Sequence, residues 1–126
     1  MQKMIVKPAG GAAAIGPYSP AVRAGEFLFC SGQIPVVPET GHIVTYGIRE
    51  QTERVLENIK ILLQDQKLDF SNVVKTTVFL TDLADFAVMN EVYGTYFKTD
   101  FPARSTVQVA ALPRGVKVEI EAVAHY

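Results

Sequence analysis

The stretch "NVVKTTVFLTDLADFAVMNEVYGTYF", residues 72–97, decides the fold, because it reads as a strand that leads directly into a helix. Residues 72–80 are rich in Val and Thr, whose β-branched side chains favour strands, and predict a central strand. Thr81, Asp82 or Asp85 can then cap a helix N-terminus. One face of this predicted helix carries Phe86, Met89, Tyr93, Tyr96 and Phe97.

Downstream of this unit, two further strands are expected. Pro102 closes the helical segment, and "PARSTVQV" leads into a strand over 105–110 with Arg104 at its start. "LPRG" at 112–115 predicts a turn into a last strand over 116–124. If these two strands pair through that turn, Arg104 and Glu119 lie on the same sheet, although their register is open.

Upstream, the pattern predicts a long helix and a hairpin. Apolar residues recur at steps of three and four over 47–67, as an amphipathic helix requires. A hairpin is expected with its turn near Ala24 and Gly25 and its returning strand over 27–31. Residues 3–7 predict a short strand, and residues 39–46 a loop with a possible edge strand. Met4, Met89 and the tyrosines are interpreted as core residues.

The order of these elements predicts an α+β fold, with two helices on one face of a mixed six-stranded sheet, in a single domain over residues 1–126. Two helices cover only one face. On the other face the last strand carries Lys117, Glu119, Glu121, Val123 and His125. Together with the neighbouring strands, this face mixes charged, hydroxyl and apolar side chains, and it is more apolar than a face exposed to solvent normally is. We therefore expect this face to be buried against other copies of the chain.

Composition excludes several classes of function. Lys and Arg number 12 against 13 Asp and Glu, so no strong field favours a nucleic-acid or membrane partner. Cys30 is the only cysteine and is interpreted as a small buried hydrophobic residue rather than a nucleophile. His42 and His125 are isolated, so no metal site is expected. Gly10, Gly11 and Gly16 match no Gly-rich phosphate-binding loop, and no cofactor is expected. Without a signal-peptide pattern or a long apolar run, a cytoplasmic location is expected.

Arg104 and Glu119 are the first candidates for chemistry. An arginine can bind a carboxylate through two parallel hydrogen bonds, but Arg104 could equally form an ordinary ion pair at a strand start. Glu119 could accept a proton from water if burial and neighbouring charges set its pKa, or it could be a solvated outward residue of the strand.

Four further residues lie where a ligand could be contacted. Tyr18, between two prolines in "IGPYSP", could cover a ligand or pin its loop to the core. Gly32 in "SGQIP" would let the backbone approach another group closely. Phe86 and Ile15 are candidates for the walls of a cleft.

Taken together, five blocks closely resemble the RidA family, also called YjgF/YER057c/UK114, in matching order over almost the whole length. They are "AAIGPYSPAV", "SGQIP", "VVKTTVFLTDLADFAVMNEVYGTYF", "FPARSTVQV" and "LPRGVKVEIEAVA". The resemblance implies a chorismate-mutase-like fold and a homotrimer whose three sheets form a central barrel, with sites in clefts between subunits.

The resemblance also implies an activity, the hydrolytic deamination of 2-iminobutanoate and 2-iminopropanoate to 2-oxo acids and ammonia. Pyridoxal-phosphate-dependent dehydratases would supply these reactive imines and enamines. By position, Arg104 would bind the substrate carboxylate and Glu119 would position or deprotonate the attacking water. Tyr18 would close over the substrate from a neighbouring subunit, and Gly32 and Thr106 would offer backbone groups.

Thr106 departs from the family pattern, since many members have cysteine there. Threonine is harmless if only the backbone at this position acts, which is the interpretation we favour. Two other functions stay open: a regulatory or chaperone-like trimer that binds a small carboxylate metabolite without turnover, and an endoribonuclease or translation inhibitor. The near-neutral charge gives the endoribonuclease no basic stripe along which to hold phosphates.

Overall fold

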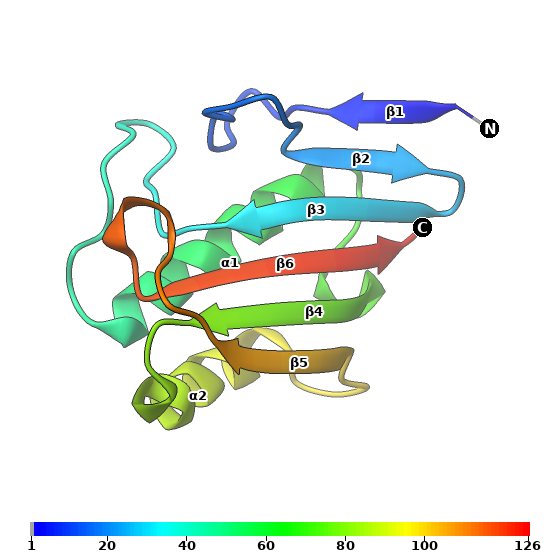
Figure 1. The fold of residues 1–126 in the computed structure, drawn as a ribbon. Coiled ribbons are helices and arrows are strands. Elements are labelled where there is room, and N and C mark those ends of the chain that lie inside the picture. The colour runs from blue at the N-terminus through cyan, green and yellow to red at the C-terminus, as the bar shows by residue number, and fades with distance from the viewer. Residues whose placement is uncertain (1) are drawn as a thin grey trace.

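The structure, a computed structural model, describes residues 2–126 and confirms the α+β class. The predicted domain start at residue 1 lies outside the described residues. The regular elements are β1 (Lys3–Val6), β2 (Ala21–Ala24), β3 (Phe27–Gln33), α1 (Ile48–Asp65), β4 (Val73–Leu80), α2 (Phe86–Tyr96), β5 (Ala103–Gln108) and β6 (Val118–His125). Both helices lie behind one face of the sheet, as Figure 1 shows.

The six strands form one mixed sheet in the order β1-β2-β3-β6-β4-β5. Every neighbouring pair is antiparallel except β4 and β5, which run parallel because α2 carries the chain back to the same end of the sheet. β4 and β6 lie in the interior of the sheet, and β1 and β5 form its two edges. The prediction of a central strand over residues 72–80 is confirmed.

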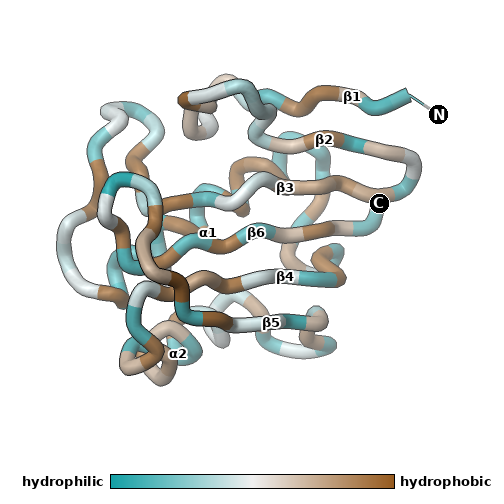
Figure 2. The backbone as a smooth tube through the Cα atoms, viewed as in Figure 1, coloured by the Kyte–Doolittle hydropathy of each residue, from teal (hydrophilic) through white to brown (hydrophobic). Residues whose placement is uncertain are grey.

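The core lies between the sheet and the helices. Val55, Leu56, Ile59 and Leu63 of α1 are fully buried, as are Val118 and Ile120 of β6. Fully burying one such side chain is worth about 1.5–3 kcal/mol relative to leaving it exposed. Figure 2 shows the alternation of polar and apolar residues along β6 that assigns one side of the strand to this core.

The hairpin and the long helix follow the sequence pattern closely. Gly25 occupies the turn between β2 and β3 with φ of 60°, a conformation that glycine adopts without strain. Gly47 is the N-cap of α1, and Asp82 accepts a hydrogen bond from the Ala84 N–H in the short 3₁₀ turn before α2.

Met4, interpreted as core, is instead 61% exposed, because it lies on an edge strand without a covering layer.

The two C-terminal strands do not pair, contrary to the hairpin considered above. The "LPRG" segment forms a 3₁₀ turn, Pro113–Gly115, in which Arg114 adopts a left-handed conformation with φ of 58°. β6 then runs antiparallel to β4 along the edge opposite β5, so that β4 separates β5 from β6. Arg104 and Glu119 belong to one sheet but lie on strands that do not touch.

Among residues 2–126, no helix is long and apolar enough to cross a bilayer.

Candidate active site

The strand register places Arg104 and Glu119 on opposite faces of the sheet. Residues paired across neighbouring strands point to the same face, and successive residues of a strand alternate. Arg104 pairs with Thr76, whose side chain is buried against α2, while Glu119 pairs with Phe79. Thr76 and Phe79 are an odd number of residues apart and therefore face opposite sides. One copy of the chain cannot bring Arg104 and Glu119 together.

Arg104 lies on the helix side in a pocket beside α2. Its guanidinium carbon is 4.8 Å from the centre of the Tyr93 ring and 5.6 Å from that of Phe86. Tyr93 is held by a 2.7 Å hydrogen bond between its hydroxyl and that of Thr76. Phe86, expected on the core face of the helix, is 38% exposed and contacts the arginine instead.

No carboxylate pairs with Arg104 within the described chain, where the one ion pair joins Arg49 to Glu91. Arg104 therefore does not form the ordinary ion pair that was the alternative to ligand binding. Its pocket, of about 480 Å³, is lined by Asn90, Tyr93, Gly94, Phe101 and Pro102. A cation on aromatic rings without a counter-ion is suited to bind an anion that comes from outside the protomer.

Thr106 follows Arg104 on the same face of the edge strand β5. Val109 donates its backbone N–H to the Leu80 carbonyl of β4. Backbone groups alternate in direction along a strand, so the N–H and C=O of Thr106 point away from β4 to the open edge. Its side-chain oxygen is buried without a hydrogen-bond partner in the protomer. Both features leave hydrogen-bonding capacity for another molecule.

Asn90 is a site residue that no motif in the sequence marks. Its side-chain oxygen is buried and, like that of Thr106, has no hydrogen-bond partner in the described chain. The signal that could have found it is spacing, because Phe86, Asn90 and Tyr93 stand one turn apart along α2. We call Phe86, Asn90, Tyr93, Arg104 and Thr106 the arginine half-site.

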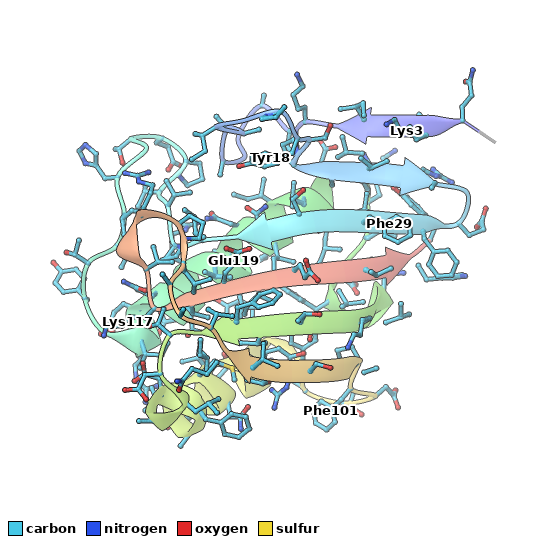
Figure 3. The ribbon with its side chains drawn as sticks, in the orientation of Figure 1. Lys3, Tyr18, Phe29, Phe101, Lys117 and Glu119 are labelled. Atoms are coloured by element: carbon cyan, nitrogen blue, oxygen red, sulfur yellow. The ribbon has the colours of Figure 1, made fainter. Side chains whose placement is uncertain are left out.

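Glu119 lies on the open face and contacts Gly32 of β3. A β-bulge between Cys30 and Gln33 shifts the register there, and a Cβ atom added to Gly32 would overlap the Glu119 carboxylate. Glycine at this position therefore makes room for the acid. Figure 3 shows Glu119 in front of the sheet, on the side without helices.

Tyr18 lies near Glu119, at the end of the irregular segment that precedes β2 (Figure 3). Its side chain is half exposed, and its hydroxyl accepts a 3.4 Å hydrogen bond from the Ile15 N–H. Ser31 holds the segment by donating its hydroxyl to the Ser19 carbonyl and its N–H to the Pro20 carbonyl. The exposed half of the Tyr18 side chain leaves it free to cover a ligand.

Tyr18, Gly32 and Glu119 share a second pocket, of about 410 Å³, which is lined also by Ile15, Ser31, Ile34, Pro113 and Glu121. We call Tyr18, Gly32 and Glu119 the glutamate half-site. Of the residues predicted to act, Arg104 lines the first pocket, and Tyr18, Gly32 and Glu119 line the second. Phe86 and Thr106 lie on the face of the sheet that carries Arg104 but do not line its pocket. The two pockets lie on different faces of the protomer.

Burial raises the pKa of Glu119 above its ordinary value, and the negative charge of Glu121, two residues along the same face, raises it further. A carboxylate with a raised pKa is a stronger base toward water. Cys30, in contrast, is buried and its thiol pKa is raised to about 12, which agrees with its interpretation as a small hydrophobic residue.

Replacing Glu121 with Gln is expected to lower the pKa of Glu119, because one of its two causes is removed while burial remains. The Glu119 carboxylate then persists to lower pH than in the wild type. An NMR titration of the Glu119 side-chain carbon measures this directly, with Glu39→Gln in an exposed loop as the control. An unchanged titration curve in Glu121→Gln would contradict the assigned cause.

Within residues 2–126, no three His, Cys, Asp or Glu side chains gather as they would around a metal ion.

Comparison with known proteins adds relatives that span the chain. The model of the family described as "Endoribonuclease L-PSP" matches residues 9–126. A RutC family protein of Pyrococcus abyssi is 54% identical over 88% of this chain and 87% of its own length. Human 2-iminobutanoate/2-iminopropanoate deaminase is 47% identical over 97% of this chain and 89% of its own. The crystal structure of E. coli TdcF with bound serine superposes with a TM-score of 0.93, at 44% identity and 98% coverage of both chains.

Proposed function

The chain belongs to the endoribonuclease L-PSP family, together with RutC and Rid proteins, and from this premise we propose that it hydrolyses reactive 2-imino acids to 2-oxo acids and ammonia. The observation that carries the proposal is the guanidinium of Arg104, which lies on two aromatic rings without a carboxylate partner in the described chain. The relatives named as 2-iminobutanoate/2-iminopropanoate deaminases support the choice of reaction.

The active site is proposed to form between two copies of the chain in a homotrimer of single-domain subunits. The arginine half-site of one copy meets the glutamate half-site of its neighbour, since neither half can reach the other within one protomer. The exposed apolar side chains of the open face, Phe27, Phe29 and Val107, support an assembly that covers this face and closes a barrel.

In this arrangement Arg104 holds the substrate carboxylate through two hydrogen bonds, each worth about 1.5–3 kcal/mol when charged. The outward backbone groups of Thr106 and the backbone at Gly32 bind the rest of the substrate. Phe86 forms a wall, and Tyr18 from the neighbouring copy closes over the ligand. These contacts hold the imine carbon and the attacking water in a fixed orientation, which lowers the entropic cost of their reaction.

The chemistry requires the movement of protons and the exchange of one bond for another. Water attacks C2 of the protonated imine, and Glu119 accepts a proton from that water as the O–C bond forms. Glu119 returns this proton to the nitrogen of the resulting carbinolamine. The C–N bond then breaks, ammonia leaves with the bonding electron pair, and the hydroxyl proton passes to the Glu119 carboxylate and on to solvent, so the oxygen remains as the 2-oxo group. The raised pKa of Glu119 suits a group that must both accept and return a proton.

The substrate is short-lived in water, so its source must be an enzyme that releases imines or enamines. Pyridoxal-phosphate-dependent serine or threonine dehydratases are proposed as that source, and a shared cytoplasmic location follows from the same proposal. Nucleic acid and membrane are not proposed as partners, because acidic and basic residues nearly balance.

Gly32→Ala is expected to lower turnover about a hundredfold, because the new methyl group displaces the Glu119 carboxylate and a shift of about 1 Å can cost that much. The carboxylate is the free end of a side chain, so thermal stability should change little. Gly10→Ala is the matched control, since a Cβ there meets nothing within 4 Å. A fully active Gly32→Ala enzyme would contradict the role given to Glu119.

The test of the proposed reaction couples a threonine dehydratase to this protein and follows the appearance of 2-oxobutanoate under conditions where the imine hydrolyses slowly by itself. Acceleration in proportion to the amount of protein is expected. A rate equal to spontaneous hydrolysis would overturn the proposal.

A second candidate is a trimer that binds a small carboxylate metabolite without turning it over. The unpaired guanidinium favours this function as well, and the related TdcF structure holds serine. Calorimetric binding of 2-oxobutanoate without any ammonia release from freshly generated imine would select this candidate over the deaminase. Neither observation favours an endoribonuclease.

A further inference from the structure

Asn90 lies in the middle of the surface on which Arg104 rests. Residues 86, 90 and 93 of α2 follow one another at helical spacing on one face. The guanidinium of Arg104 is within 6 Å of both the first and the third of these side chains. The second, Asn90, stands between them on this face of α2 and lines the same pocket as Arg104.

The side-chain oxygen of Asn90 is buried and accepts no hydrogen bond in the described chain. A buried acceptor without a donor is costly, and most such atoms in native proteins find a partner. The packing of α2 against the sheet does not explain the residue, because an apolar side chain of the same shape would fill the space without the unpaired oxygen. The unpaired acceptor indicates that a further interaction completes the pocket.

Arg104 can supply that donor. A guanidinium carries five N–H groups in a planar fork, and a carboxylate bound at one edge uses two of them. The remaining groups point sideways and backwards, toward the helix surface. An acceptor there fixes the rotation of the guanidinium about its long axis, which the flat rings of Phe86 and Tyr93 do not.

We propose that Asn90 is a positioning residue, whose side-chain oxygen accepts a hydrogen bond from the Arg104 guanidinium when a carboxylate ligand is bound. The proposal rests on the proposed function, because it assumes a carboxylate on Arg104. Asn90 does not touch the ligand, and it acts by turning the outer edge of the guanidinium toward it.

The test compares Asn90→Leu, Asn90→Asp and wild type in the coupled imine assay and in calorimetric binding of 2-oxobutanoate. Asn90→Leu removes the acceptor at nearly constant shape, and we expect KM to rise about tenfold with kcat within twofold. Asn90→Asp keeps an acceptor but adds a charge that pairs with Arg104 and competes with the ligand, so weaker binding than in Asn90→Leu is expected. Thr95→Ala is the control, because Thr95 is an exposed residue of the same helix whose hydroxyl donates to the Val92 carbonyl.

A double-mutant cycle with Arg104→Lys separates positioning from a general structural role. If Asn90 acts through Arg104, the double mutant loses less kcat/KM, in free-energy terms, than the sum of the losses in Asn90→Leu and Arg104→Lys. Fully additive losses, an unchanged KM in Asn90→Leu, or a fall in kcat alone would overturn the proposal. Failure of the wild type itself to bind or turn over the ligand would instead overturn the proposed function, and with it this inference.

Discussion

Arg104→Lys is expected to lower kcat/KM for 2-imino acids roughly a hundredfold while the free energy of unfolding hardly changes. Lysine keeps the charge but loses the planar fork that binds a carboxylate at two points, and one charged hydrogen bond is worth about 1.5–3 kcal/mol. Stability is spared because Arg104 forms no ion pair within the described residues, and its contacts with the Phe86 and Tyr93 rings are worth about 1 kcal/mol or less.

The measurement pairs steady-state kinetics in the coupled assay with thermal unfolding of the same preparations. Arg23→Lys is a suitable control, because Arg23 also lies over an aromatic ring, that of Tyr126, and belongs to neither half-site. Equal turnover by Arg104→Lys and wild type would contradict the assignment of Arg104 as carboxylate anchor. A large fall in melting temperature would show that the arginine is structural instead.

Glu119→Gln is expected to lower kcat by about 10²–10⁴, because the amide cannot accept the proton of the attacking water. The amide has nearly the same shape and fits beside Gly32, so the binding of 2-oxobutanoate should be retained. Burial and Glu121 both disfavour the charged carboxylate, and removing that charge should leave the protomer as stable or slightly more stable at neutral pH.

The sign of that stability change follows from the raised pKa. The folded protein holds the Glu119 proton more tightly than the unfolded chain does, so the wild type loses stability as pH rises through the range between the two pKa values. Glu119→Gln cannot show this loss. Stopped-flow kinetics at saturating substrate and unfolding at two pH values check the two parts, and Glu39→Gln serves as the exposed control. Unreduced kcat would exclude Glu119 as the base.

Much of the fold could be predicted because single-strand and single-helix patterns are local. The alternation of Val118 and Ile120 with Glu119 assigned the buried face of β6 correctly, and the apolar stripe of α1 placed that helix within two residues at each end. β5 spans Ala103–Gln108 and so begins and ends two residues earlier than the predicted strand over 105–110. Pro102 does not interrupt it, because an edge strand can begin directly after a proline.

The geometry of the site could not be predicted, because it depends on which strands become neighbours. A turn such as "LPRG" is compatible with a hairpin, and the left-handed Arg114 that redirects the chain is visible only in three dimensions. β4 separates β5 from β6, and the register of each against β4 places Arg104 and Glu119 on opposite faces. The resemblance supplied the idea of a site between subunits, and the register supplies an independent physical reason for it.

Mixing two inactive variants tests most directly whether the active site forms between two copies of the chain. Arg104→Ala lacks one half-site and Glu119→Gln lacks the other, so neither variant alone is expected to accelerate imine hydrolysis. When their subunits are exchanged in equal amounts, about one quarter of the interfaces unite an intact arginine half-site with an intact glutamate half-site. We predict recovery of roughly that fraction of wild-type activity, and no recovery despite mixed assemblies seen by native mass spectrometry would contradict the account.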